Sequence, residues 1–176
     1  YVAESYGAYI VQRGKNLASD ETTLDPVIYD AVNKVENKQN CKYDVVITIQ
    51  PTSPLLTTNT LDKAIELFLT NKYDTIISGV NEPHLAWGYN DEMIKPLYTE
   101  RVNRQYLPKH FKETGAFVIS KRKYISPHSR FGKNVSIFEV PGNESIDIDT
   151  PQDWWIAEKE LAKKRVLFVV DGYKAI

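Results

Sequence analysis

A core strand is encoded by the run Val45-Val46-Ile47-Thr48-Ile49, and Gln50-Pro51-Thr52-Ser53-Pro54-Leu55 follows it directly. A nearly unbroken run of β-branched residues is typical of a strand that is buried on both faces of a parallel sheet. Helical patterns stand on either side of it: one opens at Asp25 and Pro26, and the other covers residues 58–71 with its apolar positions on one stripe. This alternation predicts an α/β fold, with a mostly parallel sheet and helices on both of its faces.

The rest of the chain continues the alternation within a single domain. With 176 residues, of which 42% are hydrophobic, the chain is long enough to bury one sizeable core. Further strands are expected at residues 8–11, 75–80, 115–120, 135–140 and 145–148, and further helices at residues 1–6 and 151–164. Segment 81–111 is polar, aromatic and irregular, so we expect an excursion that carries part of a site or a subunit contact.

Composition excludes several classes of partner. The 22 basic and 23 acidic residues nearly balance, and there is no long basic run, which argues against nucleic acid or an anionic membrane as the main partner. No apolar run reaches the roughly 18 residues that would cross a bilayer. The single Cys41 cannot form an internal disulfide, so the cytoplasm is the expected compartment.

The segment Ile146-Asp147-Ile148-Asp149 combines strand periodicity with two acids, and Thr150-Pro151 follows as a helix start. Residues two apart in a strand face the same side, so both carboxylates would leave one face, roughly 6–7 Å apart. That spacing suits a hydrated hard cation such as Mg²⁺, which prefers one or two carboxylates plus substrate phosphates. The alternative is a solvated strand edge with two exposed acids.

Polar residues follow the strand at 45–49, at the edge where α/β sheets bind ligands. Gln50 offers both a donor and an acceptor, Thr52 and Ser53 add hydroxyls, and the prolines stiffen the loop. The alternative is a proline-braced turn before a helix.

Two arginines and a glycine are further candidates. Arg13, after the strand expected at 8–11, could clamp a phosphate, and Arg104 could capture a carboxylate with two parallel hydrogen bonds. Gly115 lies where the backbone can approach a ligand closely. The alternatives are a surface ion pair for Arg13, a solvated loop charge for Arg104 and a β-bulge for Gly115.

Five pieces of the chain, spread over about residues 1–160, match one known pattern in order and approximate spacing. They are Arg13 with Leu17-Ala18-Ser19-Asp20, Gln50-Pro51-Thr52-Ser53-Pro54-Leu55, Arg104-Gln105-Tyr106-Leu107-Pro108, Gly115-Ala116-Phe117-Val118-Ile119 and Ile146-Asp147-Ile148-Asp149. Together they resemble the acylneuraminate cytidylyltransferase family, which makes CMP-sialic acids and related CMP-activated nonulosonic acids. The string that begins at Gln50 is fairly specific, and the double-acid segment is less so.

The resemblance implies a nucleotide-diphospho-sugar transferase-like, Rossmann-like fold. It also implies transfer of CMP from CTP to the anomeric hydroxyl of an acidic nine-carbon sugar, with release of pyrophosphate and with Mg²⁺ or Mn²⁺ as cofactor. The catalytic, metal-binding residues would be Asp147 and Asp149. The sugar acid would be bound by Gln50, Arg104, Gly115 and Ala116, and the nucleotide by Arg13, Thr23, Thr52 and Ser53. The excursion at 81–111 would be the part through which family members form homodimers.

Several features depart from the family pattern. The opening strand and the Gly-rich loop that cradles the CTP phosphates would lie upstream of Tyr1, so we expect an N-terminally truncated domain with little activity of its own. Gly14 stands where the family often has proline, Thr114 where it usually has asparagine, and Leu24 on one of two hydroxyl positions. Residues 1–164 would form the cytidylyltransferase-like domain. Residues 165–176, with a strand at 166–170, would be a linker or the start of a second α/β module.

Two other classes of function share some of these features. A metal-dependent glycosyltransferase also uses a double-acid motif to hold a nucleotide diphosphate, but its substrate would be a nucleotide sugar. A non-catalytic binding or scaffold domain would carry the same acids as a solvated edge.

Overall fold

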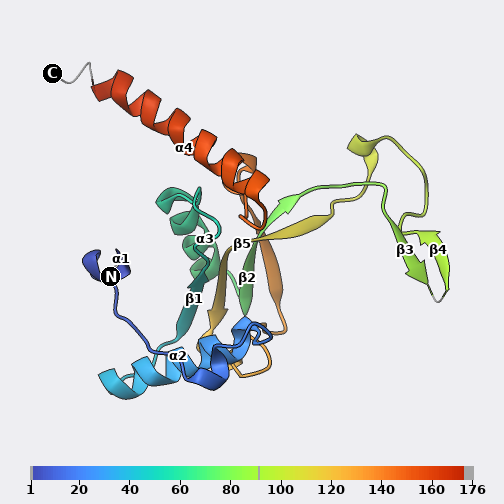
Figure 1. Ribbon diagram of the computed structural model, residues 1–176. Helices are drawn as coiled ribbons and strands as arrows, with labels where there is room; N and C mark the ends of the chain where they lie inside the picture. The colour runs from blue at the N-terminus through green and yellow to red at the C-terminus, as the bar shows by residue number, and fades with distance from the viewer. Residues whose placement is uncertain (1, 91, 173–176) are drawn as a thin grey trace. The chain divides into compact units, whose positions relative to one another are not determined.

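The computed structural model describes residues 2–90 and 92–172, with side chains described as far as Lys163. Four α-helices and six strands are assigned in this part of the chain (Figure 1). The helices are α1 (Val2–Ser5), α2 (Leu24–Gln39), α3 (Thr58–Thr70) and α4 (Pro151–Gly172). The strands are β1 (Val45–Ile49), β2 (Thr75–Asn81), β3 (Trp87–Asn90), β4 (Met93–Pro96), β5 (Phe111–Lys121) and β6 (Val135–Glu139). Short 3₁₀ turns are η1 (Lys15–Leu17), η2 (Arg104–Tyr106), η3 (Arg122–Tyr124) and η4 (Gly142–Glu144).

Four strands form one sheet in the order β1-β5-β2-β6. β1 pairs antiparallel with β5, from Val45 opposite Lys121 to Ile49 opposite Phe117. The backbone bond from Lys121 N–H to the Asp74 carbonyl (3.0 Å), which crosses from the end of β5 to the start of β2, fits an antiparallel β5–β2 pair.

β2 and β6 run in the same direction. At one end the N–H of Asp74 donates to the Asn134 carbonyl (2.8 Å), and at the other the N–H of Val140 donates to the Gly79 carbonyl (2.9 Å). The sheet is therefore mixed, with β5 opposed to its neighbours, and the expected mostly parallel sheet is confirmed only in part.

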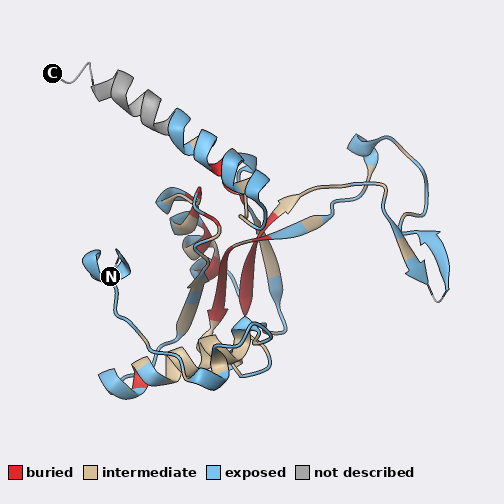
Figure 2. Ribbon diagram, viewed as in Figure 1, coloured by how far each residue is buried: buried red, intermediate tan, exposed pale blue. Residues whose placement is uncertain are grey.

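The chain divides into two compact units. The first comprises Tyr1–Ile49, Asp62–Ile77 and Phe117–Ser136, and the second Gln50–Leu61, Ser78–Ala116 and Ile137–Ile176. The first unit buries Phe68, Ile76, Phe117 and Ile119, and the second buries Leu55, Ala116, Val140 and Ala157. Figure 2 shows the buried residues concentrated on β2 and β5, the two central strands.

The starts of α2 and α4 follow the sequence signals. Asp25 lies in the first turn of α2, and Asn40 ends that helix in the left-handed conformation (φ 50°). At the start of α4, the hydroxyl of Thr150 accepts a hydrogen bond from Asp153 N–H (3.3 Å), and the Asp153 carboxylate accepts one from Thr150 N–H (2.8 Å). This reciprocal pair is a capping box, so the predicted helix start is confirmed.

A buried acid ties elements of the first unit together. Glu36 of α2 is 1% exposed, and its carboxylate accepts hydrogen bonds from Arg122 Nε (2.9 Å) and Lys42 Nζ (2.8 Å). The Arg122 guanidinium, followed by the Lys42 ammonium, lowers the pKa of Glu36 to about 2. Asp74, 8% exposed, is held in the same way by Lys121 (3.0 Å), which lowers its pKa to about 2.

Three expected strands are absent from the described residues. Residues 8–11 and 145–148 are assigned neither helix nor strand, and residues 166–170 lie inside α4. A strand needs a ladder partner, whereas Ile148 makes one backbone bond, from its N–H to the Thr52 carbonyl (2.9 Å). A helix supplies its own hydrogen bonds, so α4 can continue through an apolar run. Residues 173–176 lie outside the described part.

Two further expectations need correction. β1 lies at an edge of the sheet in the described part of the chain, and Ile47 and Ile49 are 38% and 51% exposed, so its predicted burial on both faces is wrong. The pattern cannot distinguish the two situations, because β-branched residues favour any strand. The irregular segment 81–111 contains a regular hairpin, in which Trp87 of β3 pairs with Pro96 of β4. No helix in the described chain is both long and apolar enough to cross a membrane.

Candidate active site

Gln50, Gly115 and Asp147 come together in the second unit. Gly115 lies within β5 and has a left-handed backbone (φ +68°). A Cβ atom placed there would lie 2.6 Å from Asp147 Oδ2 and 3.5 Å from Gln50 Nε2. The first distance is shorter than any real Cβ contact, so the carboxylate occupies space that only glycine leaves open. Three residues predicted from separate motifs therefore meet at one place.

The carboxylate of Asp147 is only partly satisfied by the protein. Its Oδ1 atom is buried and accepts no hydrogen bond from the residues that the structure describes. A buried oxygen without a donor is costly, and proteins retain such atoms mostly where a ligand, an ion or water completes them. An oxygen of this kind is what a hard divalent cation takes as a ligand.

Asp149 is arranged differently from the prediction. Residues 145–148 do not form a strand, so the expected common face for the two acids is lost. Asp149 is exposed, and its N–H donates to Asp153 Oδ2 (3.3 Å), which ties its backbone to the capping box of α4. Within residues 2–90 and 92–172, no group of three or more His, Cys, Asp or Glu side chains is placed to hold a metal ion. A cation here would have at most two carboxylates, with the remaining ligands from phosphate and water.

The loop after Gln50 is fastened to two other segments. The hydroxyl of Ser53 donates to the Thr114 carbonyl (3.0 Å), and the Thr52 carbonyl accepts the bond from Ile148 N–H. Ser53 is 4% exposed, so its hydroxyl works inside the protein and shapes the loop. This loop thereby joins β5 to the segment that carries Asp147.

The other predicted substrate-binding residues are spread over the second unit. Ala116 is fully buried, so it lies beneath the surface that a ligand could meet. Arg104 opens η2 with an exposed side chain, on the excursion between β2 and β5. The predicted nucleotide-binding residues Arg13 and Thr23 belong to the first unit, where both are exposed.

One residue that shapes the loop was missed by the sequence analysis. Glu144 is 6% exposed, and its carboxylate accepts hydrogen bonds from the Thr57 N–H (3.0 Å) and the Thr57 hydroxyl (3.2 Å). It thus caps the start of α3, where the loop after Gln50 ends. Its partner lies 87 positions away in the chain, and no local pattern marks such a pair.

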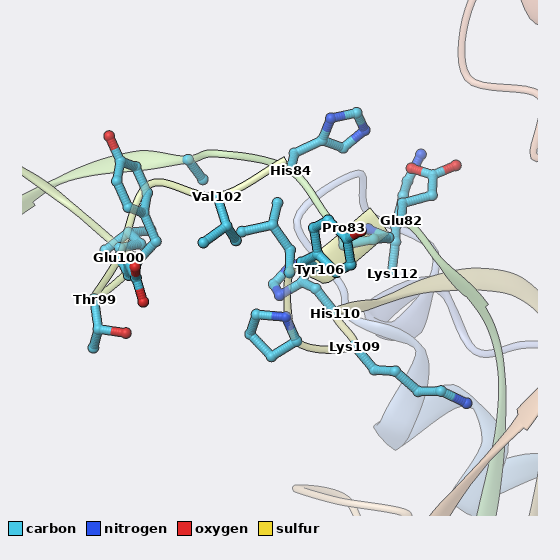
Figure 3. Close-up of a pocket in the computed structure, with 15 residues that line it drawn as sticks. Glu82, Pro83, His84, Thr99, Glu100, Val102, Tyr106, Lys109, His110 and Lys112 are labelled. Carbon is cyan, nitrogen blue, oxygen red and sulfur yellow. The ribbon is translucent and has the colours of Figure 1, made fainter. Parts of the chain in front are cut away.

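The excursion encloses a hollow of about 610 Å³, a size that suits a small molecule or a partner's side chains (Figure 3). Figure 3 shows Glu82 and Lys112 on one flank of this view and Thr99 and Glu100 on the opposite flank. Tyr106 and Leu107, from the predicted string at 104–108, line it as well. The hollow therefore combines apolar walls with charges of both signs.

Several curated relatives are similar to this chain along most of its length. Post-translational flagellin modification protein B of Campylobacter coli is 28% identical over 172 residues, which are 94% of this chain and 73% of that protein. N-acylneuraminate cytidylyltransferase A of Danio rerio is 27% identical over 92% of this chain, which spans only 38% of that protein. Pseudaminic acid cytidylyltransferase of Campylobacter jejuni is 29% identical over 86% of this chain and 68% of its own length.

The fold has a solved counterpart. The crystal structure of 4-diphosphocytidyl-2C-methyl-D-erythritol synthase from Anaerococcus prevotii superposes with a TM-score of 0.52, covering 77% of this chain and 66% of that one. At 15% identity this likeness concerns the fold alone, and it supports the predicted nucleotide-diphospho-sugar transferase-like architecture. No protein-family profile matches the chain. The predicted resemblance is thus confirmed by sequence: the chain is related over most of its length to the acylneuraminate and pseudaminic acid cytidylyltransferases.

Proposed function

We propose that this chain is the catalytic part of a cytidylyltransferase that transfers CMP from CTP to a nonulosonic, sialic-acid-like sugar acid. The observation that carries the proposal is the meeting of Gln50, Gly115 and Asp147. These residues come from three separate motifs of a chain that is 27–29% identical to named cytidylyltransferases. A scaffold domain would have no reason to leave a buried carboxylate oxygen without a donor beside a polar loop.

The proposed reaction is a displacement at phosphorus. The anomeric hydroxyl oxygen of the sugar acid forms a bond to the α-phosphorus of CTP, and the bond from that phosphorus to the bridging oxygen breaks. Pyrophosphate leaves with the electron pair of the broken bond, and the hydroxyl proton passes to solvent or to a nearby base. Such a reaction depends mainly on positioning and on neutralising negative charge.

The predicted residues of the second unit have parts in this scheme. The Gln50 amide can both donate to and accept from sugar hydroxyls, and the exposed guanidinium of Arg104 suits the sugar carboxylate. The backbone at Gly115 would lie against the sugar acid, with the buried Ala116 supporting it from beneath. Thr52 would contact the nucleotide, with Ser53 holding the loop in shape.

A divalent cation, Mg²⁺ or Mn²⁺, would be held by Asp147 and Asp149. The orphaned Oδ1 of Asp147 fits this role, and the exposed Asp149 can supply a second oxygen from the adjacent segment. When bound, the cation would neutralise charge on the triphosphate and on the departing pyrophosphate.

A second copy of the chain is the partner that we propose for the excursion. Large apolar side chains of the hairpin are more than half exposed: Trp87 (55%), Tyr89 (78%), Met93 (60%) and Ile94 (58%). A two-stranded hairpin is marginal alone in water, and an exposed apolar surface of this kind usually marks a protein contact. Sedimentation of the purified protein would report whether it is a homodimer.

The test is to follow pyrophosphate release by the purified protein with CTP, Mg²⁺ and a nonulosonic acid. We expect little CMP-sugar formation by this chain alone. In a protein that carries the family's Gly-rich phosphate loop ahead of Tyr1, we expect CMP-sugar formation that Asp147→Asn abolishes, while thermal unfolding of the variant stays near that of its parent. Unchanged product formation by the folded variant would refute the assigned role of Asp147.

Nucleotide binding separates this proposal from its two rivals. A ligand that binds only the folded protein stabilises it by about 2.7 kcal/mol at one hundred times its dissociation constant. Stabilisation by CTP with Mg²⁺, and not by UDP-sugars, supports the cytidylyltransferase, and the reverse preference indicates a glycosyltransferase. No shift with any nucleotide favours the scaffold.

A further inference from the structure

Thr114 makes two hydrogen bonds, one through its side-chain hydroxyl and one through its backbone carbonyl. Its hydroxyl donates to the Ser78 hydroxyl of β2 (3.0 Å), and its carbonyl accepts from the Ser53 hydroxyl (3.0 Å). All three residues are buried: Thr114 is 2% exposed, Ser53 4% and Ser78 0%. A buried hydroxyl is costly without a hydrogen-bond partner, so these bonds favour one fixed geometry.

This attachment lies directly before the unusual backbone of Gly115. Glycine adopts a left-handed backbone without strain but also populates many other conformations, so a single fixed conformation at Gly115 needs restraint from the neighbouring structure. The two hydrogen bonds of Thr114 supply that restraint at the position next to it. The Gly115 backbone in turn determines the space into which the Asp147 carboxylate fits, at 2.6 Å from the place of a Cβ atom.

The same loop is also connected to Asp147 from the other direction. Thr52, next to Ser53, accepts the backbone bond of Ile148, which follows Asp147 (2.9 Å). Movement of Thr114 would therefore reach the carboxylate by two routes, through Gly115 and through the loop.

We propose that Thr114 is a positioning residue of this site, whose side-chain hydroxyl, held by Ser78, fixes the backbone at Gly115 and thereby the place of the Asp147 carboxylate. The inference rests on the proposed function, because it assigns Thr114 to the site through its effect on Asp147. It predicts that removal of one hydroxyl, at nearly constant volume, weakens cation binding at a carboxylate that the hydroxyl does not touch.

The test compares Thr114→Val, which removes the hydroxyl, with Thr114→Ser, which keeps it. The readout is the affinity for Mn²⁺, measured on the purified protein from the electron paramagnetic resonance signal of the free ion. We expect Thr114→Val to weaken Mn²⁺ binding about tenfold or more, as residues that orient metal ligands typically do. Thr114→Ser should bind as the unmodified protein does.

A matched control separates positioning from general loss of stability. Thr75 of β2 is a second buried threonine, and its hydroxyl lies 3.2 Å from the Ser120 hydroxyl. The variant Thr75→Val removes that hydroxyl. It should lower thermal stability and leave Mn²⁺ affinity unchanged. If Thr114→Val does not fold, Ser78→Ala removes the same hydrogen bond from β2 and is judged by the same criterion.

Mn²⁺ affinities of two variants, Asp147→Asn and Thr114→Val, distinguish an error in the role of Thr114 from an error in the metal-binding role of Asp147. Asp147→Asn must weaken Mn²⁺ binding if Asp147 holds the cation at all. Weak binding by Asp147→Asn with full affinity in Thr114→Val overturns the role of Thr114 and leaves the function standing. Full affinity in Asp147→Asn overturns the metal role and the inference with it.

Discussion

Gly115 is the residue at which backbone conformation and chemistry meet most closely. Two features require glycine at this position. The backbone is left-handed (φ +68°), and a Cβ atom would lie only 2.6 Å from Asp147 Oδ2. A β-bulge accounts for the left-handed backbone alone, whereas a carboxylate held against the backbone accounts for both features.

Substitution Gly115→Ala should therefore do more than strain the chain. The left-handed conformation costs an alanine about 1–2 kcal/mol, and the methyl group would also displace the Asp147 carboxylate. We expect lower thermal stability together with weaker Mn²⁺ binding. Gly7→Ala is the matched control, since Gly7 has φ +83° and nothing within 4 Å of a Cβ, so it should lose stability only. Equal Mn²⁺ affinity in both variants would contradict the role of Gly115.

Sequence reasoning at this scale succeeded where a residue's chemistry has a local signature. Gln50 after a β-branched run and Asp147 in an acid-rich segment could be selected from their neighbours, and the structure brings both to Gly115. Glu144 could not, because its partner Thr57 is remote in sequence and its own neighbours carry no pattern. The sequence also could not decide between a strand and a loop for the segment that carries Asp149, because a strand needs a pairing partner elsewhere in the chain.

At the scale of elements, the start of α4 links helix stability to the site. Asp153 Oδ2 accepts hydrogen bonds from the Thr150 hydroxyl (2.7 Å), the Thr150 N–H (2.8 Å) and the Asp149 N–H (3.3 Å). These bonds, the one from the Thr150 hydroxyl above all, lower the pKa of the Asp153 carboxyl. The same carboxylate thus caps the helix and holds the backbone of a proposed metal ligand.

Removal of the cap in Thr150→Ala should destabilise the protein by about 1 kcal/mol at neutral pH. A lowered carboxyl pKa contributes stability above the ordinary pKa and loses it as the pH falls. The difference between Thr150→Ala and the unmodified protein in thermal unfolding should therefore shrink as the pH falls below 3.8, the ordinary pKa of an Asp carboxyl. Thr150→Ser keeps the hydroxyl and serves as control. A difference that stays constant with pH would show that the Asp153 carboxylate takes no part.

Helices were predicted better than strands because a helix completes its hydrogen bonds within its own segment. The starts of α2 and α4 could be read from Asp25, Pro26, Thr150 and Asp153. The alternating residues at 145–148 and the apolar run at 166–170 both have sequence patterns that are typical of strands. Neither forms one, because a ladder requires a neighbour that the local sequence does not specify.

At the scale of the whole molecule, buried acids should dominate the response to pH. The pKa of Glu36 and that of Asp74 are each about 2, below their ordinary values of 4.5 and 3.8. Both acids therefore stabilise the folded state above about pH 4.5, and this contribution is lost as the pH falls towards about 2.

Urea midpoints measured between neutral pH and about pH 2 should fall steeply over that interval. Glu36→Gln should be less stable at neutral pH and show a shallower fall. The exposed acid Glu66 of α3 provides the control, since Glu66→Gln should leave the profile unchanged. A profile in Glu36→Gln as steep as that of the unmodified protein would exclude the Arg122–Glu36 pair as a source of acid sensitivity.

The unpaired edge of β1 bears on the tendency of the protein to aggregate. Val45–Ile49 lies at the edge of the sheet in the described part of the chain, without a charge or a proline in its five residues. Such a border offers backbone donors and acceptors to any extended peptide that reaches it. In concentrated solution we expect copies to stack through it into thioflavin-binding fibrils, unless something occupies that border first.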